Sequence, residues 1–497
     1  MKLQRNLCTL ISLAACGLAH AQAQTQTQTQ TQTQTQTQTP EAPTSDAVNG
    51  SPRRIDDRRP SQPYRLWLGA TPVDLTGSWE YSDEARRNFD LETSRARNRR
   101  VREHELKLEA RARLGADLSA FVQGVALHET RTTQGTPGLQ RTHEWQRGEM
   151  WLQWDRIGTT PWSLQVGRVP LLERRTLWWD DDLDALRLRY AAGAWRLDTG
   201  LGRPVARVSS AESGIPPDQR AVWRQWGQAG WTWAPRQQVE AFWLVVADRS
   251  GTPTAGSTVA AGLDPDTSDL RGRWLGWRAS GEWRDAPGNT ASRLNYWADA
   301  MQLRGRETLT AYSGTTAGAS STRRLRSWAL DAGTTVTLGT ALRPSLTLAH
   351  ARGSGGEDSA TLDTNFRQTG LHENKARLAG VKRLRRYGEL LQPDLSNLAI
   401  TTLGSGIRFM GNSSLELVLH QYRQVVPATT VAGARLSADP QGQHRRLGSE
   451  LDLVVALREW RWLELTLRLS RFEPGPAFAT GQRDVANALE LGAALNF

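Results

Sequence analysis

Arginine is the residue type with the most distinctive chemistry in this chain. Lysine and arginine together number 62, and only four of them are lysine (Lys2, Lys107, Lys375 and Lys382), which leaves 58 arginines. The formal net charge is +11. The planar guanidinium binds a carboxylate through two parallel hydrogen bonds and stays charged at any working pH. Part of the bias is expected from a GC-rich genome, but the chemistry it supplies is the binding of carboxylates.

Charged residues occupy every second position in several otherwise apolar segments. In residues 104–114, leucine and alanine alternate with Glu105, Lys107, Glu109, Arg111 and Arg113. In residues 463–470, four leucines alternate with Glu464, Thr466, Arg468 and Ser470. A period of two places the two sets on opposite faces of a β-strand. A one-sided soluble sheet would turn these charges to bulk water, whereas a closed barrel would turn them into its lumen.

The last residues of the chain alternate in the same way and end in an aromatic carboxy terminus. One face carries Leu489, Leu491, Ala493, Leu495 and Phe497, and the other carries Ala488, Glu490, Gly492, Ala494 and Asn496. Outer-membrane barrels resemble this segment closely, because their strands are apolar towards lipid and polar or small towards the lumen. We therefore expect a transmembrane strand at the carboxy terminus.

Short and long connections alternate between the expected strands. Residues 458–461 look like a tight turn, whereas residues 209–220, 250–270, 352–370 and 427–444 are long and rich in Gly, Ser, Thr, Pro and Asp. Short periplasmic turns and long extracellular loops are typical of outer-membrane barrels. The sequence thus predicts an all-β fold, in which residues 64–497 form a single transmembrane antiparallel β-barrel. Its length suggests roughly 16 to 20 strands, a size that leaves an aqueous channel.

Bulk composition is compatible with two environments. The mean hydropathy of −0.54 suggests a soluble protein, but only alternate residues of a barrel face lipid. The 21 tryptophans fit aromatic girdles at the membrane interfaces. They would equally fit the core of a soluble β-rich protein.

The amino terminus predicts an export signal in residues 1–23. Lys2 and Arg5 provide a basic start, residues 7–18 form a short apolar run, and cleavage is expected after Ala21 or Ala23. The apolar run is too short for a membrane-spanning helix. Residues 24–63, which contain repeated Gln-Thr pairs and then many Pro and Ser residues, predict a disordered tether.

Both cysteines of the chain, Cys8 and Cys16, fall within this export signal. Removal of residues 1–23 would leave no thiol, which excludes disulfides and thiolate-bound metals. A second interpretation stays open, because residues 13–16 (Leu-Ala-Ala-Cys) resemble a lipoprotein cleavage site that would leave Cys16 lipidated.

Several segments follow each other in an order that is similar to one protein family. The clearest are residues 351–356 (ARGSGG), 366–371 (FRQTGL), 374–375 (NK), 386–389 (RYGE) and 395–398 (LSNL). Supporting segments are residues 167–168 (GR), Trp178 with Asp180, 183–186 (LDAL), 294–298 (LNYWA), 450–455 (ELDLVV) and 472–475 (FEPG). Together they resemble the alginate export proteins of bacterial outer membranes.

The resemblance implies a monomeric barrel of eighteen strands that lets alginate or polymannuronate leave the cell. It also implies an electropositive, arginine-rich constriction with a few carboxylates opposite. Carried over by motif, the basic constriction positions fall at or beside Arg168, Lys375, Arg383 and Arg468, with Arg147 as a further candidate, and Asp180 falls at an acidic position. Pro170 stands where a second basic residue is expected, so the identity of the polymer is left open.

The same resemblance implies the partners of the chain. They are an anionic polysaccharide, outer-membrane lipid and a periplasmic scaffold lipoprotein of the export complex. No cofactor, no metal and no nucleic acid are expected.

The histidines favour no enzyme class. Those at positions 104, 128, 143 and 372 each precede a glutamate, but none has a second histidine four residues later, so the zinc-protease motif is absent. A periplasmic uronate lyase is the remaining enzymatic alternative, with His420 and Tyr422 as acid and base and Arg423 as the group that neutralises the uronate. A general anion-selective porin for small solutes is the other alternative.

Overall fold

The computed structural model describes residues 63–95, 97–136, 138–259, 265–287 and 291–497. The expected export signal (1–23), the alternative lipidation site at Cys16 and the tether up to residue 62 lie outside the described residues. In the part of the chain that is described, no helix is both long and apolar enough to cross a membrane.

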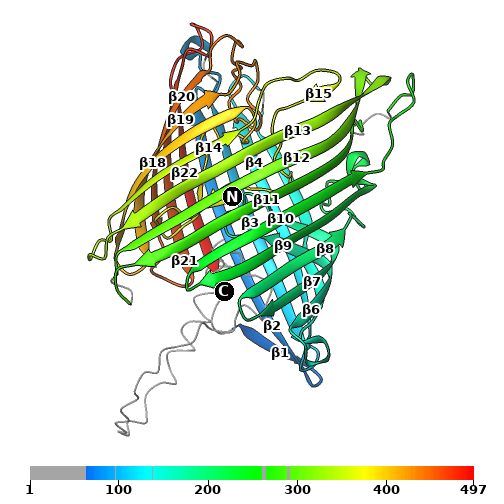
Figure 1. Ribbon diagram of the computed structural model, residues 1–497, viewed down its shortest axis with the longest axis vertical. Helices are drawn as coiled ribbons and strands as arrows, with labels where there is room; N and C mark the ends of the chain where they lie inside the picture. Colours follow the sequence, from blue (N-terminus) through cyan, green and yellow to red (C-terminus); the bar gives the residue numbers. More distant parts are fainter. Residues whose placement is uncertain (1–62, 96, 137, 260–264, 288–290) are drawn as a thin grey trace, which may run out of the picture. The chain divides into compact units, whose positions relative to one another are not determined.

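The described chain forms a closed antiparallel β-barrel of 18 strands (Figure 1). The barrel strands are β2 (Thr71–Arg87), β3 (Arg99–Arg113), β4 (Leu118–Thr133), β5 (Gln140–Trp154), β6 (Trp162–Leu172), β7 (Asp180–Ala192), β8 (Trp195–Gly202), β9 (Val222–Ala234), β10 (Gln237–Asp248), β11 (Ser268–Arg284), β12 (Arg293–Ser313), β13 (Thr316–Thr337), β14 (Ser345–Gly353), β18 (Leu398–Phe409), β19 (Ser413–Gln424), β20 (Arg446–Leu457), β21 (Leu463–Pro474) and β22 (Ala486–Asn496). Closure is direct, because β2 pairs with β3 on one side and with β22 on the other.

Shorter elements accompany the barrel. They are β1 (Tyr64–Leu68), β15 (Leu362–Asp363), β16 (Lys375–Ala376), β17 (Leu384–Arg385) and three 3-10 turns, η2 (Thr93–Arg95), η3 (Ile157–Thr159) and η4 (Pro217–Gln219). β1 forms a hairpin with the first residues of β2, and β16 pairs with β17. The all-β barrel expected from the sequence is confirmed.

The alternating residues adopt the two faces that their period predicts. In β21, Leu465 and Leu469 are 37% and 40% exposed, whereas Glu464 and Thr466 are 6% and 5% exposed. The polar side chains therefore point into the barrel and the leucines point outwards. This is the reverse of a soluble protein and suits a wall that faces hydrocarbon outside and polar groups inside.

Long loops gather at one rim and short turns at the other. The connections of residues 203–221, 249–267, 354–397 and 425–445 each follow a strand that runs towards the same rim. These connections contain the four long segments expected from composition. The exceptions are residues 352–353, which belong to β14, and residues 268–270, which belong to β11. The opposite rim has tight connections such as residues 193–194, 235–236 and 458–462. The predicted turn at 458–461 is thus confirmed.

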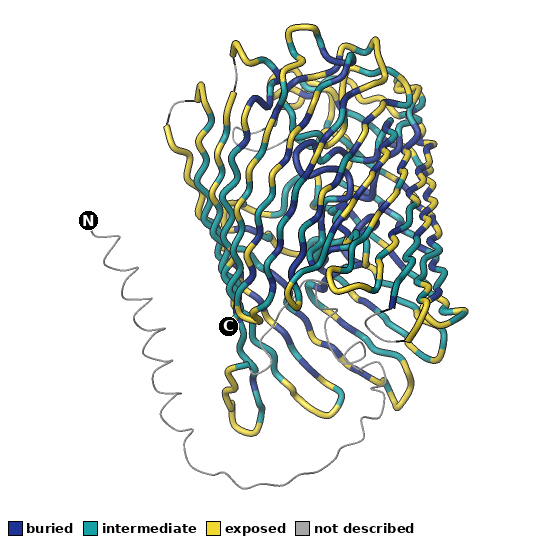
Figure 2. The backbone as a smooth tube through the Cα atoms, turned by 90° about the vertical axis from the view of Figure 1, so that its left-hand side faces the viewer, coloured by how far each residue is buried: buried dark blue, intermediate teal, exposed yellow. Residues whose placement is uncertain are grey.

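Two connections from the long-loop rim fold into the barrel rather than away from it. They are residues 173–179 and residues 354–397, called here the short and the long inner segment. Their apolar side chains are buried, among them Trp178, Phe366, Tyr387 and Leu391, and they belong to one hydrophobic cluster with inward residues of the wall. Figure 2 shows buried chain inside the ring of strands. The inner segments therefore fill part of the lumen.

Candidate functional site: a mixed-charge cavity in the lumen

A cavity of polar character lies between the long inner segment and the wall, mainly its strands β2, β3, β21 and β22 with one residue each from β4 and β5. The polar residues that the wall contributes are Ser78, Glu80, Ser82, Glu103, Lys107, Glu109, Gln123, Glu149, Glu464, Thr466, Arg468, Glu490 and Asn496. The long inner segment contributes Lys375, Lys382, Arg383, Arg385, Glu389 and Gln392, and the loop 425–445 adds Arg435. The site thus exists only because the long inner segment folds back towards the first and last strands.

Apolar contacts hold the long inner segment beside the cavity. Lys375 lies opposite Arg385 in the β16–β17 pair, and Ala376 lies opposite Leu384. Leu384 is 3% exposed and packs in a small buried cluster with Val418 of β19 and Val454 of β20. Burial of such side chains contributes roughly 1.5–3 kcal/mol each. The β16–β17 pair is therefore positioned by wall residues that point inwards.

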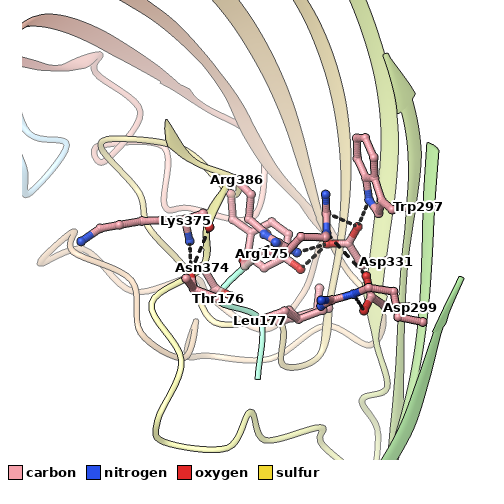
Figure 3. A network of polar contacts seen from close by, with 12 residues as sticks. Arg175, Thr176, Leu177, Trp297, Asp299, Asp331, Asn374, Lys375 and Arg386 are labelled. Atoms are coloured by element: carbon pink, nitrogen blue, oxygen red, sulfur yellow. Dashed lines mark hydrogen bonds and ion pairs between the residues drawn. The ribbon is translucent and has the colours of Figure 1, made fainter. Parts of the chain in front are cut away.

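A buried ion network anchors both inner segments to the wall (Figure 3). Its members come from the short inner segment, the long inner segment and the strands β11, β12 and β13. Glu173 accepts hydrogen bonds from Arg278 at 2.5 and 3.3 Å, and Arg278 also donates to Asp299 at 2.6 Å.

Asp331 is the second centre of this network. It accepts hydrogen bonds from Arg386 at 2.9 Å, Tyr387 at 2.9 Å, Trp297 at 2.7 Å and Arg175 at 3.2 Å. Both inner segments thus meet at one wall carboxylate. Breaking such a buried pair by removing one partner typically costs about 3–5 kcal/mol, because a charge is left uncompensated.

Glu173, which directly follows β6, has a pKa well below its ordinary value. Burial alone would raise the pKa, but the charge and hydrogen bonds of Arg278 and the backbone N–H of Arg175 lower it from 4.5 to about 2. Glu173 also accepts hydrogen bonds from the backbone N–H groups of Leu177 at 2.5 Å and Trp178 at 3.1 Å. This carboxylate therefore orders the short inner segment as long as it is ionised.

Cations and carboxylates line the cavity in equal number. The cations are Lys107, Lys375, Lys382, Arg383, Arg385, Arg435 and Arg468. The carboxylates are Glu80, Glu103, Glu109, Glu149, Glu389, Glu464 and Glu490. The cavity is therefore of mixed charge, and the electropositive constriction implied by the sequence resemblance stays a prediction.

Ion pairs connect most of these groups. Lys382 contacts Glu464 and lies 3.0 Å from the Thr466 hydroxyl, while Glu464 is also 2.8 Å from Arg458. Lys375 lies 2.8 Å from Glu373. Because each of these lysines already contacts a carboxylate of the protein, an incoming carboxylate would compete with existing partners rather than meet bare cations.

Among the described residues, Arg468 and Lys107 are the two cations that the wall strands contribute to the cavity. Arg468 contacts Glu490 and lies 3.6 Å from Glu389. Lys107 contacts Glu105 and lies 3.5 Å from Glu80. The contacts with Glu490 and Glu80 connect neighbouring strands of the wall, and the contact with Glu389 connects the wall to the long inner segment.

The structure brings some of the residues expected from the sequence together and separates others. Lys375, Arg383 and Arg468 line the cavity. Asp180, at the start of β7, lies 3.1 Å from Arg383, so it is tied to the cavity through that residue. These four lie on three elements that are far apart in the chain.

Arg147 and Arg168 are placed away from this cavity. Arg147 donates two hydrogen bonds to Asp184, at 2.6 and 2.8 Å. Arg168 lies opposite Asp184 in the β6–β7 register. Neither arginine is among the residues that line the cavity.

Sequence reasoning left out Lys107, Lys382, Arg385 and Arg435 as site residues. Lys107 had a usable signal, because it lies on the polar face of an alternating strand. Lys382 adjoins Arg383 in the chain, so its neighbour pointed to it. Arg435 lies in a loop without periodicity, and nothing in its local sequence indicates that it faces the lumen.

A closed antiparallel barrel with an apolar outer face and a charged interior defines a porin-type channel of the bacterial outer membrane. Residues 71–491 match a family model described as "Alginate export". The chain therefore belongs to the alginate export family.

The chain is also similar in sequence to one curated relative and similar in fold to solved structures. Alginate production protein AlgE of Pseudomonas aeruginosa (strain PAO1) is 27% identical over 315 residues, which cover 62% of this chain and 62% of that protein. The chain thus spans less than two thirds of the length of this relative. Among solved structures, Pseudomonas aeruginosa OccK7 (OpdD) has a TM-score of 0.52 at 11% identity, covering 86% of this chain and 99% of that one. OpdL of the same organism has a TM-score of 0.50 at 11% identity, covering 85% and 98%. These likenesses show the fold alone.

Proposed function

We propose that this protein is a passive channel that exports an anionic polysaccharide of the alginate class through the outer membrane. The observation that carries the proposal is a cavity in the lumen to which both the wall and the long inner segment contribute cations. Membership of the alginate export family and the name of the curated relative support the same substrate class.

Charge complementarity gives the physical reason. A uronate polymer carries one carboxylate per sugar, so each repeat that enters the cavity finds a cation as partner. The wall carboxylates, such as Glu464 and Glu490, compete for the same cations. This competition keeps each polymer contact weak, which passage requires, because a solute must leave each site as readily as it enters.

We further propose that one chain forms one pore, since β2 and β22 close the barrel without a second chain. The arginine-rich constriction is assigned to Arg383, Arg385, Arg435 and Arg468 together with the neighbouring lysines. Asp180 is a proposed member through its contact with Arg383, whereas Arg147 and Arg168 lie outside the cavity and are proposed as residues of the wall. A periplasmic scaffold lipoprotein remains the proposed protein partner.

Conductance in a planar bilayer tests the proposal. The refolded protein is expected to form an anion-selective channel that polymannuronate blocks, and Arg383→Ala is expected to weaken the block. Arg141→Ala is the matched control, because Arg141 is an exposed residue of β5 that does not line the cavity.

Two results would contradict the proposal. A channel that is anion-selective but indifferent to the polymer would indicate a general anion porin. A folded protein that remains soluble without detergent and forms no channel would overturn the channel itself and return attention to a uronate lyase.

A further inference from the structure

All the lysines in the described part of the chain line the same cavity. Lys107, Lys375 and Lys382 are among its lining residues, and the only other lysine of the sequence, Lys2, lies outside the described residues. In a chain with 58 arginines lysine is rare, and a genome that favours arginine codons would account for that rarity but not for the place at which the few lysines lie.

The fold brings these lysines together from two distant parts of the chain, the wall strand β3 and the long inner segment. Lys107 lies on the wall strand β3, Lys375 begins β16, and Lys382 lies between β16 and β17. Their side chains are 18%, 34% and 24% exposed, so a solute in the cavity can reach each of them. In Figure 3 the Lys375 side chain extends away from the Arg175–Arg386–Asp331 network.

Each lysine has a glutamate of the protein as partner. The pairs are Lys107 with Glu105 and, at 3.5 Å, with Glu80, then Lys375 with Glu373 at 2.8 Å, and Lys382 with Glu464. Glu464 is also held by Arg458 at 2.8 Å, so it stays in place when Lys382 turns to another partner. A passing carboxylate can therefore displace the glutamate and later be displaced by it.

Lysine and arginine differ in how they release a carboxylate. The guanidinium holds it through a planar fork, in two hydrogen bonds that depend on orientation. The ammonium is a compact, strongly hydrated charge on a flexible stem, and it accepts a carboxylate from any direction. Lysine is thus suited to brief contacts with a moving chain, and arginine to long-lived ones.

We propose that Lys107, Lys375 and Lys382 are the transfer contacts for uronate carboxylates, and that their being lysine rather than arginine sets the speed at which the polymer passes. This inference rests on the proposed export function and adds to it the residues that determine the rate. The cavity arginines form the long-lived contacts that retain the polymer in the lumen, and the lysines form the brief contacts that let it move forward.

The test replaces all three lysines by arginine, which preserves the charge. In a planar bilayer, the measurement compares how long polymannuronate oligomers block the wild-type channel and the Lys107→Arg/Lys375→Arg/Lys382→Arg channel. Each blocking event is expected to last roughly threefold to tenfold longer in the variant. A tenfold increase corresponds to about 1.4 kcal/mol. Anion selectivity for small ions is expected to be unchanged. Arg141→Lys, outside the cavity, is the control for the exchange itself and is expected to have no effect.

The outcomes separate the two proposals. A wild-type channel that is blocked, together with an unchanged dwell time in the triple variant, overturns the lysine assignment and leaves the export function standing. A wild-type channel that polymannuronate does not block overturns the export function first.

A second measurement needs no variant to fold. Acetylation of the refolded wild-type protein removes the charge of lysines only and leaves every arginine intact. Polymannuronate is expected to protect Lys107, Lys375 and Lys382 from acetylation, as read by peptide mass spectrometry, and prior acetylation is expected to weaken the block. Equal acetylation with and without polymer, or an undiminished block after it, contradicts the assignment.

Discussion

The ring of Phe497 lies directly against the backbone of Gly77, at the seam where the last strand meets the first. The Gly77 N–H donates to the Phe497 carbonyl oxygen at 2.7 Å, and the Phe497 N–H donates to the Gly77 carbonyl oxygen at 2.9 Å. A Cβ atom at position 77 would lie 2.5 Å from the ring. The terminal aromatic residue therefore completes the closure of the barrel, and a glycine makes the space for it.

Gly77→Ala is expected to loosen this seam. The added methyl group forces the Phe497 ring or the strand pairing to shift, at a cost of about 1–3 kcal/mol. Folded barrel can be followed by heat-dependent migration in gels as urea is raised. Gly124→Ala is the control, because a Cβ atom there meets no other atom within 4 Å. Equal stability of the two variants would contradict the seam as described.

Asp331→Asn is expected to release the inner segments. The substitution leaves Arg175 and Arg386 buried without their shared carboxylate, which costs about 3–5 kcal/mol. We expect higher single-channel conductance and faster proteolysis within residues 354–397, with the barrel itself intact.

Asp117→Asn is the control for the ion network. Asp117 pairs with Arg156, their side chains are 36% and 63% exposed, and such an exposed pair contributes only about 0–1 kcal/mol. If both variants conduct alike, the buried network does not hold the inner segments.

Acid is expected to undock the short inner segment as Glu173 becomes protonated. The folded pKa of Glu173, about 2, is below its ordinary value of 4.5. A depressed carboxylate pKa gives stability that is complete above the ordinary pKa and is lost as pH falls through the folded pKa. The loss should therefore begin near pH 4.5 and approach completion near pH 2. Fluorescence of the buried Trp178 and Trp179 can follow it.

Glu173→Gln removes the titrating group and provides the comparison for this acid titration. In this variant the pH-dependent part of the fluorescence change between pH 4.5 and 2 is expected to shrink, and the short inner segment should be less firmly docked already at neutral pH. A titration identical to that of the wild type would assign the acid response to another group.

Arg147→Ala distinguishes a wall residue from a pore residue. The bidentate contact of Arg147 with Asp184, at 2.6 and 2.8 Å, predicts a loss of stability. Because Arg147 does not line the cavity, block by polymannuronate is expected to stay as in the wild type. A weakened block in a channel of normal stability would return Arg147 to the constriction expected from the sequence.

Much of the fold was predictable because strand alternation is local information. Residues 463–470 indicate by themselves which side chains face the lumen, and β21 adopts that arrangement. The long connections were also visible in composition, and all four lie at one rim. The sequence did not reveal that residues 354–397 turn inwards, because their apolar residues have no strand or helix period.

Strand alternation predicted the barrel and its inward polar faces, motif order predicted the family, and composition restricts lysine to three positions of the described chain. Which charges meet became visible only in the folded chain, where Lys107 shares a cavity with Lys375 and Lys382 and Arg147 pairs with Asp184 instead. Periodicity fixes the face on which a residue lies, but the partner across the lumen depends on barrel closure and on where buried contacts such as Leu384 with Val418 and Val454 hold the long inner segment.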